Sequence, residues 1–148
     1  MPPSIRIDIA AQRLTFRDGE RQLHFPISSG RNGIGFREGS GCTPTGRFRI
    51  VSKHGEHAPL LTIFRARLPV GLWPEASGGQ DDVLTRILCL DGLDPQNANT
   101  LSRYIYIHGT IHTEQLGTPA SHGCIRLAPE AMSRLFDLTP LGTPVTII

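Results

Sequence analysis

The sequence predicts a mainly β domain with one short helix near its C-terminal end. Apolar and polar residues alternate over the first part of the chain, glycines and prolines interrupt the apolar segments at short intervals, and a single segment carries helix-start signals. At 148 residues the chain is most simply one domain, residues 1–148, long enough to bury a core without disulfide support.

The first third of the chain predicts strands. Residues 5–9 alternate isoleucine with polar side chains, the pattern of a half-buried strand. The alternation continues through 14–16 and returns through 23–27 after Asp18-Gly19, a dipeptide typical of a hairpin turn. Residues 30–46 hold six glycines and predict a long loop. Phe48 and Ile50 then mark another strand.

The sequence pattern in the middle of the chain predicts secondary structure less clearly. Residues 59–70 mix strand and turn signals, and 83–90 are apolar enough for a buried strand or a short helix. Residues 91–99 are rich in Asp, Gly, Pro and Asn, which predicts a mobile surface loop that could act as a flap over a cleft. Residues 104–107 predict a short strand that delivers His108 at its end.

The C-terminal segment holds the expected helix and a last strand. Pro129 suits the first helical position and Glu130 lies near the positive end of the helix dipole, so we expect a helix over 129–136. Residues 144–148 predict a closing strand. The chain therefore ends in the order strand, helix, strand.

Composition excludes several classes of function. The formal net charge of +2 is too small to indicate a nucleic-acid partner, and no apolar run approaches the ~20 residues that span a bilayer. No signal-peptide pattern follows Met1, so the sequence as it stands predicts a cytoplasmic protein, whereas a leader ahead of Met1 would make it periplasmic. Three cysteines rule out a fully paired disulfide framework, so at least one thiol is free.

One segment carries the residues of a nucleophilic site. Cys124 follows His122 and Gly123, and His108 stands at the end of a predicted strand sixteen positions earlier. A free thiol is only slightly ionised at neutral pH, so we expect an adjacent imidazole to hold this sulfur ionised. The plainer interpretation is a buried structural cysteine. Two histidines and a flexible glycine beside one cysteine favour the catalytic interpretation.

The roles within this cluster follow from position. His108 is the better general base, because a strand end holds an imidazole more accurately than a loop does. A carbonyl of Gly109, Thr110 or Ser121 would fix its tautomer. His122 could tune the thiolate, orient the loop or touch substrate. The backbone N–H groups of Gly123 and Cys124 could form an oxyanion hole.

The same residues carry a family resemblance. Ser121-His122-Gly123-Cys124-Ile125-Arg126-Leu127, preceded by Ile107-His108-Gly109-Thr110, resembles the catalytic signature of the L,D-transpeptidase (YkuD-type) family. Thr43-Pro44-Thr45-Gly46-Arg47-Phe48 is similar to a second recurring segment of that family. The resemblance implies a β-sandwich-like catalytic domain with Cys124 as nucleophile and His108 as base. It also implies that Arg126 shapes the site or holds substrate. Ser121, Gly109 and Thr110 are the further candidates for substrate contacts.

The resemblance also implies a reaction and its partners. In that family the thiolate attacks the carbonyl of the third residue of a peptidoglycan stem tetrapeptide, expels the terminal D-Ala and leaves a thioester. Water then gives L,D-carboxypeptidase trimming of muropeptides, expected for a cytoplasmic recycling enzyme. An amine instead gives 3→3 cross-links or exchange of D-amino acids, expected in the periplasm. Carbapenem-type β-lactams should acylate Cys124, and no cofactor is implied.

Two other classes of function stay open at this point. His108, His112, His122 and Cys124 could supply a tetrahedral zinc set, although Gly109 argues against a helix that would align the first two. A wall-binding module without catalysis would require an unreactive cysteine. Arg103, Arg126 and Arg47 are candidate contacts for substrate carboxylates, because guanidinium groups pair with them bidentately.

Overall fold

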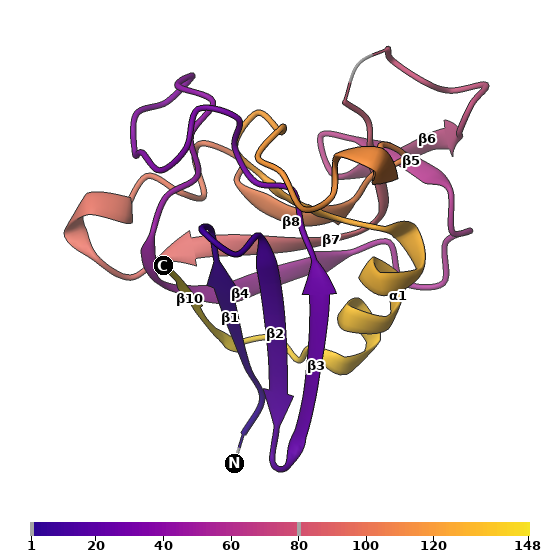
Figure 1. Cartoon of the computed structure of the whole chain (residues 1–148). Coiled ribbons are helices and arrows are strands. Elements are labelled where there is room, and N and C mark those ends of the chain that lie inside the picture. The colour runs from indigo at the N-terminus through magenta and orange to yellow at the C-terminus, as the bar shows by residue number, and fades with distance from the viewer. Residues whose placement is uncertain (1, 80) are drawn as a thin grey trace.

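The computed structural model describes residues 2–79 and 81–148, and within them ten strands form one hydrogen-bonded sheet that curls into two crossing layers (Figure 1). The strands are β1 Ser4–Asp8, β2 Arg13–Asp18, β3 Arg21–Pro26, β4 Gly46–His54, β5 Thr62–Arg65, β6 Leu68–Leu72, β7 Val83–Gly92, β8 Tyr106–Gly109, β9 Ile125–Leu127 and β10 Pro144–Ile147. The one α-helix, α1, spans Pro129–Leu138, and two 3₁₀ turns span Pro95–Asn97 and Thr113–Gln115. The predicted mainly β class with a helix after the cysteine is confirmed.

The sheet order is β3-β2-β1-β10-β4-β7-β5-β6, with β8 pairing with β7 and with β9. Most neighbours are antiparallel, and β1 with β10 and β8 with β9 are parallel pairs. The layer of β1, β2 and β3 crosses in front of β4, β7 and β8 in Figure 1. The predicted N-terminal strands and their hairpin turn at Asp18-Gly19 are present, with Gly19 at φ +61°.

The core lies between the two layers and α1. Ile5, Ile7, Leu14 and Phe16 point inward from β1 and β2, as the alternation predicts. They join Ile107 and Ile125 of the site strands, and Met132, Leu135 and Phe136 of α1, in one apolar cluster. A smaller cluster of Phe64, Ile87, Cys89 and Tyr106 lies on the other face of β7, and Cys124 packs against it. Each fully buried side chain of this size stabilises the fold by about 1.5–3 kcal/mol.

Tertiary packing decided the ambiguous middle of the chain. Residues 83–90 are strand, part of β7, because β4 and β8 pair with this segment and both of its faces are buried. Residues 59–70 contain β5 and most of the β5–β6 hairpin. The strand expected over 104–107 begins at Tyr106, since Tyr104 adopts φ +59°, and it includes His108.

The segment 91–99 is only in part the surface loop that its composition predicts, since most of 93–99 is exposed. Residues 91 and 92 end β7, and Asn97 is fully buried. The Asn97 amide donates to the carbonyls of Thr45 and Arg47, each at 3.1 Å, and its Oδ1 accepts from the Asp94 N–H at 2.9 Å. These bonds anchor the segment to the start of β4. No helix in the described part of the chain has the length and apolar character needed to cross a bilayer.

Candidate active site

Side chains from several distant segments converge on one pocket of about 220 Å³. The pocket is lined by Asp81, Val83, Arg103, Tyr104, Ile105, His108, His122 and Cys124. The sheet register explains this convergence: β8 lies between β7 and β9, with His108 opposite Ile87 on one side and Arg126 on the other. Because Cys124 immediately precedes β9, the pairing of β8 with β9 brings the predicted base and nucleophile into the same pocket.

A tight turn before β9 presents Cys124 to the pocket. Gly123 adopts φ +136°, and a Cβ there would lie 3.0 Å from the Cys42 carbonyl oxygen, so only glycine fits without strain. Ser121 Oγ accepts from the Gly123 N–H at 3.1 Å and donates to the Cys124 carbonyl at 2.7 Å. Thr43 Oγ1 donates to the Gly123 carbonyl at 2.8 Å. The Gly-rich loop therefore supports the turn that carries the thiol.

The Cys124 thiol is half-buried and bonded to main chain. The Tyr106 N–H donates to Sγ at 3.3 Å, and the thiol donates to the Tyr104 carbonyl at 3.4 Å. Burial raises the pKa of Cys124 to about 11, against the opposing effect of the Tyr106 amide. The resting thiol is therefore protonated at neutral pH, which differs from the expectation that an imidazole holds it ionised.

His108 is a buried histidine with a fixed tautomer. Its side chain is only 2% exposed, and Nδ1 lies 2.6 Å from the Gly109 carbonyl oxygen. Because a carbonyl only accepts, Nδ1 carries the hydrogen and Nε2 is left with its lone pair free. Burial lowers the pKa of His108, with the Gly109 bond opposing the shift. The imidazole is therefore neutral at pH 7, the form that can accept a proton.

The base and the thiol line the same pocket with no hydrogen bond between them in the described structure. Across the described residues no hydrogen bond joins the His108 ring to the Cys124 thiol, whose hydrogen is directed to Tyr104. Of the two predicted oxyanion donors, the Gly123 N–H is occupied by Ser121. No hydrogen bond in the described part of the chain uses the Cys124 N–H, so this amide is the available donor. A proton transfer from Cys124 to His108 requires the thiol to rotate away from Tyr104.

An acidic residue that sequence reasoning missed connects two predicted site residues. Asp81 accepts from Arg126 Nη1 at 2.9 Å through Oδ1, and its Oδ2 lies 3.4 Å from His122 Nδ1. Arg126 Nη2 also donates to Ser28 Oγ at 2.9 Å and to Gln115 Oε1 at 2.6 Å. Asp81 comes from the polar segment before β7, where no sequence pattern distinguishes it from its neighbours. Only the fold reveals its place.

Several residues predicted to contact substrate are buried and lie outside the pocket lining. Ser121, Thr110 and Arg126 are at most 1% exposed, Gly109 is also buried, and none of the four belongs to the pocket lining. These residues are buried because β9, the turn before it and the residues around the end of β8 pack against the rest of the sheet. Substrate contact by them stays a prediction. The burial of Arg126 favours the first of its two implied roles, shaping the site, over holding substrate.

Of the arginines proposed to contact carboxylates, Arg103 alone lines the pocket. Its Nη2 donates to the Cys42 carbonyl at 2.9 Å, and Nη1 to the Gly35 carbonyl at 3.4 Å, so it also holds the Gly-rich loop. Arg47 lies outside the pocket lining and forms an ion pair with Asp94 at 2.7 Å.

The residues of the alternative zinc set do not gather as metal ligands would. His112 Nδ1 lies 3.4 Å from Glu114 Oε1, on a segment that contributes nothing to the pocket lining. In residues 2–79 and 81–148 no group of three or more His, Cys, Asp or Glu side chains is arranged to hold a metal ion.

Comparison with known proteins agrees with this geometry. A family model described as the L,D-transpeptidase catalytic domain (YkuD) matches residues 2–147. The chain belongs to this family. The match includes both the Gly-rich loop that supports the turn and the segment from His108 to Cys124.

Individual L,D-transpeptidases match in part or in fold. A Fuscovulum blasticum protein named as a candidate L,D-transpeptidase in the ATP synthase subunits region is 48% identical over 42 residues, 28% of this chain and 22% of that protein. An L,D-transpeptidase crystal structure from Xylanimonas cellulosilytica is 23% identical with TM-score 0.65, covering 99% of this chain and 60% of that chain. LD transpeptidase LdtMt1 in complex with imipenem is 21% identical with TM-score 0.63, covering 99% and 58%. At these identities the two structures establish a shared fold, and this chain spans under two thirds of each relative.

Proposed function

We propose that this chain performs cysteine-dependent acyl transfer on peptidoglycan stem tetrapeptides, with Cys124 as nucleophile and His108 as base. The observation that carries the proposal is the pocket shared by the Cys124 thiol and an imidazole whose Nδ1–H is held by Gly109. The free Nε2 is the atom that would accept the thiol proton. Membership of the L,D-transpeptidase family supports the same substrate class.

Acylation follows from these groups. His108 Nε2 takes the proton from Cys124 Sγ as the sulfur adds to the carbonyl carbon of the third stem residue. The carbonyl oxygen becomes negative, and the Cys124 N–H would donate to it. The intermediate collapses by breaking the C–N bond to D-Ala, and the imidazolium returns its proton to the leaving amine. A thioester on Cys124 and free D-Ala are the products.

Burial determines the stage of the reaction at which the Cys124 thiol proton passes to His108. The pKa of Cys124 is raised and that of His108 is lowered, so burial favours the neutral pair while the pocket is empty. Ionisation then accompanies attack, when the charge passes from sulfur to the substrate oxygen. A thiol kept neutral between turnovers is also protected from oxidation, because the thiolate is the reactive form.

The second half of the reaction depends on the acceptor. Water attacking the thioester carbon yields a tripeptide carboxylic acid and returns the proton to Cys124, the L,D-carboxypeptidase outcome suited to soluble muropeptides in the cytoplasm. An amine from a second stem yields an amide, a 3→3 cross-link, and a free D-amino acid yields exchange, outcomes suited to the periplasm. His108 would remove the proton from either acceptor.

A soluble disaccharide tetrapeptide tests the proposal. We expect the wild-type protein to release D-Ala, with the products identified by mass spectrometry, and the Cys124→Ala variant to release none. Adding a D-amino acid or a second stem separates the outcomes: tripeptide alone indicates hydrolysis, whereas an exchanged tetrapeptide or a dimer indicates transpeptidation. Substrate binding without any product from the wild-type protein would instead identify a non-catalytic wall-binding module.

A further inference from the structure

A second feature of the molecule lies on the outer surface of its N-terminal layer. The exposed side of neighbouring strands β2, β1, β10 and β4 carries Arg6, Arg13, Arg17, Arg47 and Arg49, here called the arginine face. All five side chains are exposed, since they alternate with buried apolar residues along their strands. The inward residues of β1 and β2 reach the core cluster that contains Ile107 and Ile125. The arginine face therefore points away from the pocket of Cys124.

The strand register gathers three of these arginines. Arg6 on β1 is opposite Thr15 on β2, so it lies diagonally between Arg13 and Arg17. Diagonal neighbours in an antiparallel pair are about 7–8 Å apart, close enough for long side chains to share one ligand. On the other side, Thr146 of β10 separates Arg6 from Arg47 in the same row.

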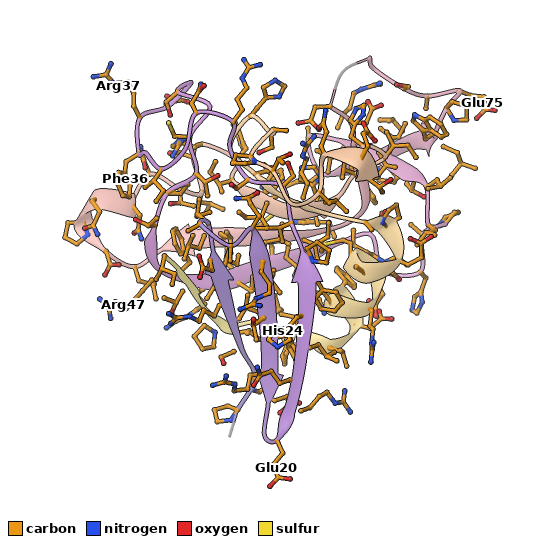
Figure 2. All side chains as sticks on the ribbon, viewed as in Figure 1. Glu20, His24, Phe36, Arg37, Arg47 and Glu75 are labelled. Atoms are coloured by element: carbon orange, nitrogen blue, oxygen red, sulfur yellow. The ribbon has the colours of Figure 1, made fainter. Side chains whose placement is uncertain are left out.

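A pocket of about 520 Å³ lies over this cluster. Its lining includes the three clustered arginines, His24, and the hydroxyl residues Ser4, Thr15 and Thr146. His24 Nδ1 lies 2.8 Å from Thr15 Oγ1, and Arg17 Nη2 donates to Gln22 Oε1 at 3.1 Å, so neighbouring side chains orient each other. Figure 2 shows His24 over the near side of β2 and β3, and Arg47 of β4 at the left of these strands.

Among the described residues, no ion pair neutralises the clustered Arg6, Arg13 and Arg17. Asp8 lines the same pocket, opposite Arg13 in the register, yet no ion pair joins them in the described structure. Of the five arginines, Arg47 alone forms an ion pair with a described residue, and that partner is Asp94. Like charges on adjacent strands repel each other and weaken the sheet. A bound anion would remove that repulsion.

We propose that the arginine face binds the carboxylate groups of polymeric peptidoglycan at a second contact, separate from the catalytic pocket. The choice of polymer rests on the proposed function, and the charge of the face supports it. Guanidinium groups pair with carboxylates through two parallel hydrogen bonds, and every basic residue in the chain except Lys53 is arginine. Peptide stems repeat their carboxylates along the glycan, so several weak contacts add through multivalency. Because this face points away from Cys124, one stretch of polymer holds the enzyme while another stem enters the pocket.

Binding to purified insoluble peptidoglycan tests this proposal without turnover. The Cys124→Ala protein is pelleted with native peptidoglycan and with peptidoglycan whose carboxyl groups have been converted to neutral amides. We expect binding to the native polymer that weakens with added salt, since exposed charges are screened, and little binding to the amidated polymer. Equal binding to both polymers overturns the proposal.

Variants locate the contact. In the Cys124→Ala background, Arg6→Gln with Arg17→Gln should weaken binding to native peptidoglycan on the order of tenfold, whereas Arg6→Lys with Arg17→Lys should retain part of it. Arg37→Gln with Arg134→Gln removes the same charge from exposed positions elsewhere and should bind like the parent. Equal losses in the two glutamine pairs overturn the proposal, and thermal melting shows whether each pair is folded.

Two separate measurements distinguish failure of this proposal from failure of the proposed function. Release of D-Ala from the soluble tetrapeptide reports on the pocket, and pelleting of the Cys124→Ala protein reports on the arginine face. Activity with no charge-dependent binding rejects the arginine face alone. Charge-dependent binding with no activity rejects the catalytic proposal and leaves the arginine face as a carboxylate-binding surface.

Discussion

At the scale of single residues, burial and the Asp81 carboxylate shift the pKa values of Cys124 and His108 in the pocket. Desolvation is the largest influence on both Cys124 and His108, and it favours the neutral form of each. The charge of Asp81 raises the pKa of both groups, whereas the buried Arg126 guanidinium lowers them. The ion pair of Asp81 with Arg126 therefore adjusts how readily a proton passes from the thiol to the imidazole.

Asp81→Asn should lower the pKa of Cys124, because it removes a negative charge that opposes the thiolate while keeping an oxygen to accept from Arg126. In the wild-type protein the alkylation rate of Cys124 with iodoacetamide should rise with pH toward about 11, since only the thiolate reacts. In the variant the same curve should move to lower pH. A matched change, Glu75→Gln, alters an exposed carboxylate and should leave the curve in place (Figure 2). A variant curve that stays put or moves upward rejects this role for Asp81.

Gly123→Ala should disturb the turn that carries the nucleophile. Position 123 has φ +136°, and an added Cβ would lie 3.0 Å from the Cys42 carbonyl oxygen and 3.2 Å from Ile105 Cδ1. We expect a loss of about 1–3 kcal/mol in the free energy of unfolding, measured by denaturant titration, together with a fall in Cys124 acylation. Gly142→Ala is the control, because that position has φ +84° but nothing within 4 Å of the added Cβ. Equal losses at both positions would mean that backbone conformation alone matters.

The secondary-structure elements place the site through their pairing. β8 is only four residues long, and its neighbours β7 and β9 hold His108 at a defined register. A slip of one residue would turn His108 to the other face of the sheet and destroy the pocket. The long strand β7 is itself aligned by β4, whose start is anchored by the segment that follows β7. Support for the site thus extends to elements that do not line the pocket.

Asn97→Ala should test that anchor. The substitution removes three part-buried hydrogen bonds, to the carbonyls of Thr45 and Arg47 and from the Asp94 N–H, and the Arg47 carbonyl keeps only its bond from the Leu93 N–H. These losses should lower the free energy of unfolding by about 2–3 kcal/mol. Asn99→Ala removes one exposed bond, to the Phe36 carbonyl, and should cost less than half as much. Chemical denaturation measures both. If the two variants are equally stable, residues 91–99 are not the anchor described here.

At the scale of the whole molecule, the catalytic pocket and the arginine face occupy separate parts of the surface. The pocket forms at the junction of β8 and β9, and the face forms on the outer side of β1, β2, β10 and β4, with the apolar core between them. The formal net charge of +2 does not reveal the arginine face, because acidic residues elsewhere in the chain offset the charge of the clustered arginines.

Intact-protein mass spectrometry should show one imipenem molecule bound to the wild-type protein. The strained β-lactam carbonyl presents the same electrophile as the stem, and ring opening retains the whole inhibitor on Cys124 as a thioester. Cys124→Ser, with its weaker nucleophile, should show no adduct under the same conditions, although Cys42 and Cys89 remain. An adduct retained in this variant would place the reaction elsewhere.

The local sequence pattern was enough to predict the elements whose formation depends mainly on neighbouring residues. Period-2 alternation predicted β1, β2 and β3, and a proline with a following acidic residue predicted α1. The spacing of His108, Gly123 and Cys124 identified the candidate site, because a base, a turn and a nucleophile must occur together for this chemistry. A short apolar run such as 83–90 carries no period that separates strand from helix.

Tertiary contacts decided the rest. Asp81 joined the site because the segment before β7 folds back beside β9. The buried Arg126 guanidinium bonds through its two Nη atoms to Asp81, Ser28 and Gln115, while its Nε has no partner among the described residues. The protonation of Cys124 followed from burial, a property of the assembled sheet that residue order does not contain. Exposure of a side chain, the charge beside it and the direction of its hydrogen bonds all depend on residues far away in the sequence, and these quantities control the chemistry of the pocket.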